Sequence, residues 1–184
     1  MNLKPLIGKA TNGSLEPSEL HEVVRCLEAN SCDPYDALLI IGRAGAIQYR
    51  YLIVKYLNAR DNPILTRLAL MIICRYWKLT AEYKNVLEVF VRKVEWDDDD
   101  DIRVLAISIT GSLLATQPDR HLLELLIGIF RDSSEPQLIR EVAYCALAEA
   151  SGRTPAELPS AARHFDLERD VDPYVMAYIQ AAER

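Results

Sequence analysis

The chain has 184 residues, of which 50% are hydrophobic and 26% are charged, and its formal net charge is −6. This much apolar surface can offset the conformational entropy lost on folding, so the composition excludes an intrinsically disordered chain. The sequence contains 7 glycines and 9 prolines, whereas average usage would give about 22 of the two residues together. The shortage of residues that interrupt helices favours a helical fold.

Apolar residues recur with the period of a helix along most of the sequence. Three segments, which begin near Pro17, Tyr83 and Pro118, have apolar residues on one face only. Four others are apolar on every side, which requires that neighbouring helices flank them. These four are residues 36–43, 64–77, 102–114 and 138–150. The alternation predicts antiparallel helix pairs, which we place at residues 17–45, 46–78, 79–116 and 118–152.

Short breaks that contain proline or aspartate precede one helix of each pair. They lie near residues 34, 63, 99, 136 and 173, so their spacings are 29, 36, 37 and 37 residues. An arginine follows three of these breaks by four residues, at Arg67, Arg103 and Arg140. A period in the high thirties that contains a helix pair is typical of a helical solenoid.

One pattern recurs at these breaks, as Asp61-x-Pro63-x-x-x-Arg67, Asp98-x-x-x-Ile102-Arg103-x-x-Ala106 and Glu135-Pro136-x-x-x-Arg140-x-x-Ala143. In these residues the chain resembles the HEAT-repeat family, over about residues 17 to 151. The resemblance implies an all-α fold, namely a right-handed α-solenoid of about five antiparallel helix pairs.

The expected organisation has three parts. Residues 1–16 form an N-terminal extension, residues 17–152 form the repeats, and residues 153–184 form capping helices of the same domain. The capping helices are expected at Ala156–Arg163 and Pro173–Ala182. Gly45 and Gly152 stand where a helix ends with a residue in the left-handed conformation.

Targeting signals and cysteine spacing bear on the compartment. Residues 1–10 hold no apolar run of the kind found in a secretory signal, and no stretch reaches the ~18 apolar residues of a membrane span. Cys26, Cys32, Cys74 and Cys145 show no C-x-x-C pairing. We therefore expect a reduced, cytoplasmic protein that does not associate with a membrane.

Five consecutive aspartates, Asp97 to Asp101, are the most acidic feature of the sequence. They match the opening of a calcium-binding loop, but such a loop needs glycine at its sixth position and glutamate at its twelfth. Those positions are Ile102 and Ser108. Carboxylates that cap the following helix, or that dock a protein, are the simpler interpretation.

No catalytic grouping emerges from the sequence. His21, His121 and His164 follow no metal-ligand spacing, and the lone His21-Glu22 pair argues against the iron-binding hydroxylases built on HEAT repeats. There is no G-x-S-x-G motif and no glycine-rich phosphate loop. In HEAT-like proteins the repeated arginines commonly link neighbouring repeats, so a structural ladder is favoured over a ligand site at these arginines. We expect a non-enzymatic protein with no cofactor and no metal.

The net charge conceals an uneven distribution. Residues 43–93 hold 10 basic and 3 acidic residues, a balance of +7, whereas residues 94–184 hold 8 basic and 18 acidic residues, a balance of −10. The basic segment also contains six aromatic residues: Tyr49, Tyr51, Tyr56, Tyr76, Trp77 and Tyr83. Three interpretations remain open, namely a helix core with a solvated basic face, a protein interface, and a nucleic-acid surface.

A short solenoid with patterned charge is most simply a protein-binding module that uses the second helix of each pair. More specifically, we expect an inhibitor, such as a bacterial toxin-immunity protein, whose acidic surface meets a basic toxin domain. The expected contact residues are Arg67, Met71, Arg75, Lys78, Asp97, Asp98, Asp99, Asp100, Asp101, Arg103, Arg140, Glu141 and Tyr144.

Two alternatives belong to other functional classes. The alkylpurine DNA glycosylases resemble HEAT stacks and use a basic, aromatic concave face. In this chain Trp77, Arg67, Arg75 and a carboxylate would have to carry out that reaction, and the overall acidity of the chain argues against this alternative. The other alternative is an accessory subunit of an enzyme, similar to the HEAT-like components of chromophore lyases.

Overall fold

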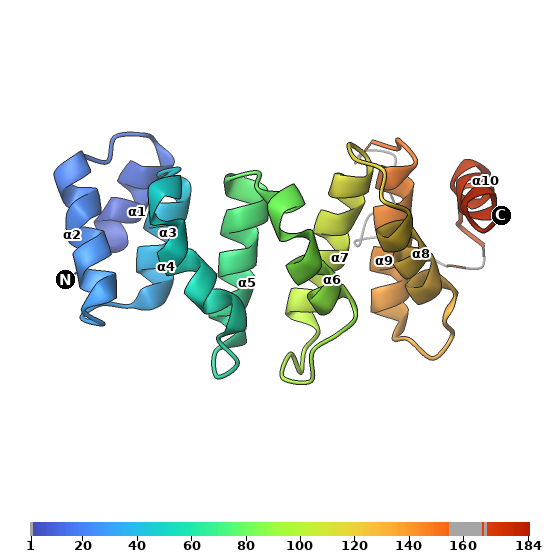
Figure 1. The fold of residues 1–184 in the computed structure, drawn as a ribbon, viewed down its shortest axis with the longest axis horizontal. Helices are drawn as coiled ribbons and strands as arrows, with labels where there is room; N and C mark the ends of the chain where they lie inside the picture. Colours follow the sequence, from blue (N-terminus) through green and yellow to red (C-terminus); the bar gives the residue numbers. More distant parts are fainter. Residues whose placement is uncertain (1, 155–166, 168) are drawn as a thin grey trace. The chain divides into compact units, whose positions relative to one another are not determined.

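The computed structural model describes residues 2–154, 167 and 169–184. Its described residues form ten α-helices joined by turns and contain no strand, which confirms the all-α class. The helices, labelled in Figure 1, are α1 (Lys4–Thr11), α2 (Pro17–Glu28), α3 (Pro34–Arg43), α4 (Arg50–Val54), α5 (Pro63–Met71), α6 (Lys84–Val91), α7 (Asp101–Leu114), α8 (Arg120–Arg131), α9 (Gln137–Ala150) and α10 (Pro173–Ala182). Among these helices none is long and apolar enough to cross a membrane.

The chain divides into two compact units. The first contains residues 1–83 and 95–102, and the second contains residues 84–94 and 103–184. Helices α1 to α5 therefore belong to the first unit. Helix α6, most of α7, and helices α8 to α10 belong to the second.

Most predicted helices are present, and α10 has the predicted bounds. The predicted segment Ala156–Arg163 lies outside the described residues. Two features differ from the sequence analysis. Residues 4–11, within the expected N-terminal extension, form α1. The pair expected at 46–78 is irregular, because 3-10 turns flank α4 and a π-helical turn, Ile72–Tyr76, follows α5.

Local sequence accounts for where several helices begin and end. The carboxylates of Asp33, Asp119 and Asp172 accept hydrogen bonds from backbone N–H groups in the first turns of α3, α8 and α10, at 2.9, 3.2 and 2.7 Å. Proline occupies the first turn of α3 and α10, where no N–H is needed. Gly45 and Gly152 have φ values of 64° and 95°, which confirms the predicted left-handed helix ends.

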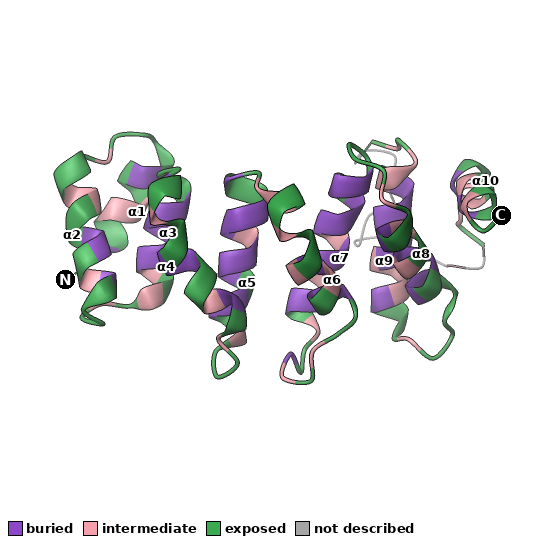
Figure 2. Ribbon diagram, in the orientation of Figure 1, coloured by how far each residue is buried: buried purple, intermediate pink, exposed green. Residues whose placement is uncertain are grey.

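Helix α3 forms the centre of the first unit, since it packs against α1, α2 and α5. Residues 37–42 of α3 are all buried (Figure 2). The π-helical turn packs closely against it, because a Cβ atom at Gly42 would lie 2.6 Å from Cγ1 of Ile72. The indole N–H of Trp77, directly after this turn, donates to the Gly42 carbonyl at 3.1 Å. Gly42 therefore permits both contacts.

In the second unit α8 packs along α9, and α10 packs against both. Helices α7 and α9 approach each other at small residues. A Cβ atom at Gly111 would lie 2.6 Å from Cα of Ala146 and 2.7 Å from its carbonyl oxygen. One residue further along α7, the Ser112 hydroxyl donates to the Glu149 carboxylate at 2.8 Å.

We predict that Gly111→Ala destabilises the protein by about 1–3 kcal/mol, because backbone atoms of α9 occupy the space that the methyl group needs. Gly128→Ala is the matched control in the same unit, since no atom lies within 4 Å of a Cβ at that helical position. The control should stabilise the fold by about 0.5–1 kcal/mol. Urea unfolding of both variants measures the difference, and equal effects would contradict the close contact.

Candidate partner-binding surfaces

Arg103 is a buried arginine that joins three segments of the second unit. Its Nε atom donates to the carbonyl of Val91, the last residue of α6, at 3.0 Å. Its terminal nitrogens donate to both oxygens of Glu135 at 2.7 and 2.5 Å. The side chain of Arg103 is only 4% exposed, and that of Glu135 is 20% exposed. This bidentate pair is the contact expected of a structural arginine.

The other two arginines of the series differ from Arg103. Arg140 repeats one of its bonds, because Nε of Arg140 donates to the carbonyl of Phe130 near the end of α8 at 3.2 Å. Arg67 is exposed. Instead of Arg67, the preceding residue Thr66 bonds to the end of the helical segment before it. Its hydroxyl donates to the carbonyl of Tyr56 at 2.9 Å. A bond to the end of the preceding helix therefore recurs in three helix pairs, through different side chains.

The aspartates of the run Asp97 to Asp101 differ in burial, and the first of them stabilises the fold. Asp97 is buried, and its carboxylate accepts a hydrogen bond from the backbone N–H of Ile102 at 2.9 Å. This bond stabilises the start of α7, as the capping interpretation predicts. Asp98, Asp99 and Asp101 are exposed, and Asp100 is half-buried. Within residues 2–154, 167 and 169–184, no group of three or more His, Cys, Asp or Glu side chains could hold a metal ion.

The remaining predicted contact residues are divided between the two units. Arg67, Arg75 and Lys78 are exposed in the first unit, with Met71 half-buried. Arg140 and Glu141 are half-buried on α9 of the second unit. Tyr144 is buried, and its hydroxyl oxygen accepts a hydrogen bond from the backbone N–H of Asp172 at 2.6 Å. Because Asp97, Arg103 and Tyr144 make internal contacts, they are not surface residues.

The basic, aromatic segment of the first unit contains both core and surface. Leu52 and Ile53 are buried, whereas Arg50, Tyr51 and Lys55 are exposed. The exposed residues contribute to a hollow of about 570 Å³ lined by Arg50, Tyr51, Val54, Lys55, Glu82 and Tyr83. Their polar groups already have partners, because Arg50 pairs with Glu82 at 3.4 Å and the Tyr51 hydroxyl donates to Glu28 at 2.7 Å. The Tyr51 bond raises the pKa of that hydroxyl.

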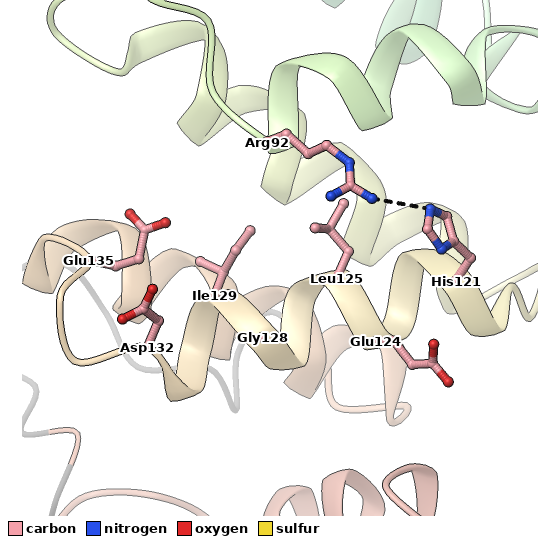
Figure 3. A pocket seen from close by; sticks show the side chains of 8 residues that line it. All are labelled: Arg92, His121, Glu124, Leu125, Gly128, Ile129, Asp132 and Glu135. Atoms are coloured by element: carbon pink, nitrogen blue, oxygen red, sulfur yellow. Dashed lines mark hydrogen bonds between the residues drawn. The ribbon is translucent and has the colours of Figure 1, made fainter.

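A pocket on the exposed face of α8 was not anticipated from the sequence (Figure 3). Its volume is about 350 Å³. Leu125, Gly128 and Ile129 form its floor, with Arg92 and His121 at one end and Asp132 and Glu135 at the other, whereas the Glu124 side chain points away from them (Figure 3). The complete lining is Arg92, His121, Glu124, Leu125, Gly128, Ile129, Asp132 and Glu135. We refer to this site as the α8 pocket.

The basic side chains of the α8 pocket are already matched by a carboxylate. The guanidinium of Arg92 lies 3.0 Å from Oε1 of Glu88, and Nε2 of His121 lies 2.9 Å from the same oxygen. The hydrogen bonds from His121 and Arg92 lower the pKa of Glu88. Arg92 also lies 3.4 Å from His121, the contact drawn in Figure 3. Glu88 thus offsets the positive charge at this end.

The other end of the α8 pocket is acidic. Asp132 is exposed, and its Oδ1 atom accepts hydrogen bonds from the Ser134 hydroxyl at 2.7 Å and from the Ser134 N–H at 2.9 Å. These bonds lower the pKa of Asp132, so its carboxylate is ionised at neutral pH. Glu135 is held in place by Arg103. Because the Glu135 charge is matched by Arg103, the negative charge at this end of the pocket comes from Asp132.

Gly128 is an unusual residue for this floor. It lies within α8 and is exposed, and a Cβ atom there would meet nothing within 4 Å. Packing of the chain therefore does not require a glycine, and glycine costs about 0.5–1 kcal/mol relative to alanine inside a helix. The missing side chain leaves the backbone of α8 open to close approach from outside.

The chain matches no family model, no curated protein and no solved structure in the comparisons made. The site therefore has to be interpreted from its own residues. The predicted contact residues lie mainly on the second helix of each pair, whereas the α8 pocket lies on a first helix. The one local signal for it is the glycine in the otherwise amphipathic sequence of α8.

We predict that Arg103→Ala destabilises the protein by about 3 kcal/mol, because it leaves Glu135 without its buried counter-charge. It also removes the bond to the Val91 carbonyl. Arg120→Ala is the matched control, since Arg120 forms an exposed pair with Glu124 at 2.8 Å, and such pairs contribute about 0–1 kcal/mol. Thermal unfolding compares the two variants. A loss for Arg103→Ala no larger than for the control would contradict the structural role.

Proposed function

We propose that this chain is a non-enzymatic protein-binding module, and more specifically an inhibitor that neutralises a basic protein such as a bacterial toxin domain. The observation that supports this most directly is the α8 pocket, where Asp132 holds negative charge beside an apolar floor. The exposed aspartates Asp98, Asp99 and Asp101 add negative surface in the first unit. Opposite charge on a partner speeds association and gives specificity.

The chemistry of the α8 pocket favours a lysine or arginine side chain of the partner. The methylene groups of such a side chain can cover Leu125 and Ile129, while the charged head meets carboxylates. Asp132 is already oriented by Ser134, so its carboxylate loses little freedom when a cation binds. Each carboxylate oxygen has two lone pairs and can accept a further hydrogen bond.

The same proposal includes the HEAT-like architecture, a right-handed α-solenoid of stacked helix pairs. Its support is the recurring bond to the end of the preceding helix, made by Thr66, Arg103 and Arg140. The pair between Arg103 and Glu135, which connects successive helix pairs, adds to it. A cytoplasmic location is also proposed, on the support of four cysteines that are free thiols.

The charges of the α8 pocket can be tested with a matched pair of double variants. We expect Glu124→Lys with Asp132→Asn to weaken partner binding by roughly tenfold, which is about 1.4 kcal/mol. Asparagine keeps the hydrogen bonds from Ser134 while removing the charge. The measurement is capture from a lysate of the native cells on the immobilised chain, with mass spectrometry, followed by titration of the purified captured protein.

The control is Glu22→Lys with Asp33→Asn, on α2 and before α3. It makes the same chemical changes, since Glu22 is exposed and Asp33 accepts a bond from Tyr35 N–H at 2.9 Å, as Asp132 does from Ser134 N–H. Both doubles therefore have the same net charge. The captured protein should be basic and should elute with salt. Capture of a neutral protein in a salt-independent manner, or equal loss in both doubles, would contradict the proposal.

Gly128→Ala gives an independent test, because stability and binding should change in opposite directions. The methyl group should stabilise α8 by about 0.5–1 kcal/mol, yet it should weaken binding of the partner that approaches the pocket floor. Gly8→Ala is the matched control. Gly8 is also exposed near the end of a helix, has open space at its Cβ position, and accepts the N–H of the residue after the helix. Calorimetric titration of both variants should show weaker binding for Gly128→Ala alone.

A further inference from the structure

The outer face of α4 carries a stripe of exposed apolar side chains. Helix α4 and the 3-10 turns on either side of it form one helical run. Leu52 and Ile53 are the buried side of α4. Ile47, Tyr51 and Val54 are spaced i, i+4 and i+7, so they share another face of the run, where they are 41%, 48% and 37% exposed. The core of the first unit therefore leaves these three side chains uncovered.

The stripe borders the hollow of about 570 Å³ in the first unit, because Tyr51 and Val54 also line that hollow. We refer to the stripe and the hollow together as the α4 surface, which consists of Ile47, Arg50, Tyr51, Val54, Lys55, Glu82 and Tyr83. Apolar residues that are exposed singly are ordinary, whereas a contiguous group with polar residues at its rim is typical of an interaction site.

Tyr51 is held in place from two sides. Its hydroxyl donates to the Glu28 carboxylate at 2.7 Å, and the Lys55 ammonium lies 5.8 Å from the centre of its ring. An aromatic side chain that is already oriented loses little freedom when a partner packs on it. Tyrosine is also among the residues that most often anchor protein interfaces. Tyr51 is therefore suited to anchor a partner on the α4 surface.

Arg50 and Lys55 place positive charge beside the stripe. Arg50 pairs with Glu82 at 3.4 Å, but both side chains are more than half exposed, and such pairs contribute little to stability. A carboxylate of a partner can therefore replace Glu82. In the described part of the chain no carboxylate forms an ion pair with Lys55. An apolar stripe flanked by cations is complementary to an apolar stripe flanked by carboxylates.

We propose that the α4 surface binds an acidic amphipathic helix of a partner protein. The apolar stripe of such a helix would pack along Ile47, Tyr51 and Val54, and its acidic residues would meet Arg50 and Lys55. This site does not depend on the function proposed above. It lies in the first unit and binds an acidic segment, whereas the α8 pocket lies in the second unit and suits a basic one.

A single-stranded nucleic acid is the other class of ligand that basic and aromatic residues can bind. Such a strand stacks its bases on aromatic rings and carries a phosphate at every nucleotide. Ile47 and Val54 offer no ring, and the carboxylates of Glu28 and Glu82 already lie at the α4 surface. These residues favour a protein segment, which can place its carboxylates beside the cations alone.

The experiment measures binding of a fluorescein-labelled peptide to the full-length protein by fluorescence anisotropy. The probe is a peptide of about 15 residues, long enough to form a helix. It has leucine at every third or fourth position, glutamate on both sides of this stripe and alanine elsewhere. We expect it to bind at least tenfold more tightly than the same peptide with glutamine in place of glutamate, and added salt should weaken its binding.

Two double variants test the charge. Arg50→Gln with Lys55→Gln should weaken binding of the acidic peptide roughly tenfold. Lys4→Gln with Arg25→Gln is the matched control, because both residues are exposed on helices of the same unit and the net charge changes equally. The control should bind as the wild type does.

Two further doubles test the apolar stripe. Ile47→Ser with Val54→Ser should also weaken binding roughly tenfold, whereas Ile64→Ser with Val89→Ser should not. Ile64 and Val89 are the matched pair, since they are 64% and 55% exposed elsewhere on the chain. All the substituted side chains are exposed, so each variant should keep its fold, which circular dichroism checks.

Three outcomes would overturn the proposal. The first is no binding of the acidic peptide at about 1 mM, or equal losses in a double variant and its control. The second is that a labelled single-stranded oligothymidylate binds the α4 surface in place of the peptide, which would assign it to nucleic acid. The third is a dimer in sedimentation that Ile47→Ser with Val54→Ser dissociates, which would make a second copy of the chain the occupant.

Discussion

A buried cation, Arg103, connects three segments of the second unit. A guanidinium inside a protein must satisfy its donors, and Arg103 does so with the Val91 carbonyl and both oxygens of Glu135. These acceptors fix the end of α6 and the loop that precedes α9. The same contact orients Glu135 at the rim of the α8 pocket. The stability of the unit and the position of one residue at the pocket rim therefore have a common origin.

The α8 pocket is suited to binding a charged group. It presents fixed charge and open backbone, which suits reversible recognition of a cationic side chain.

Local signals predicted much of the fold. Pro34 with Asp33, and Pro173 with Asp172, mark helix starts through groups adjacent in sequence, so they could be recognised without tertiary information. The π-helical turn at Ile72–Tyr76 could not, since it accompanies the packing of Ile72 and Trp77 against Gly42. The α8 pocket escaped prediction for a similar reason. Arg92 and Glu135 reach it from segments outside α8, so only the folded chain assembles it.

The close contact of α7 with α9 has a consequence for how the second unit unfolds. Gly111 meets Ala146 backbone to backbone, and Ser112 bonds to Glu149 beside it. Helices of different pairs are therefore in direct contact through atoms that cannot rotate away, unlike long side chains. Contacts between packed helices determine whether the helices open together or separately. Opening of α9 would strip α7 of this contact, so the two helices should exchange their amide protons as one cooperative unit.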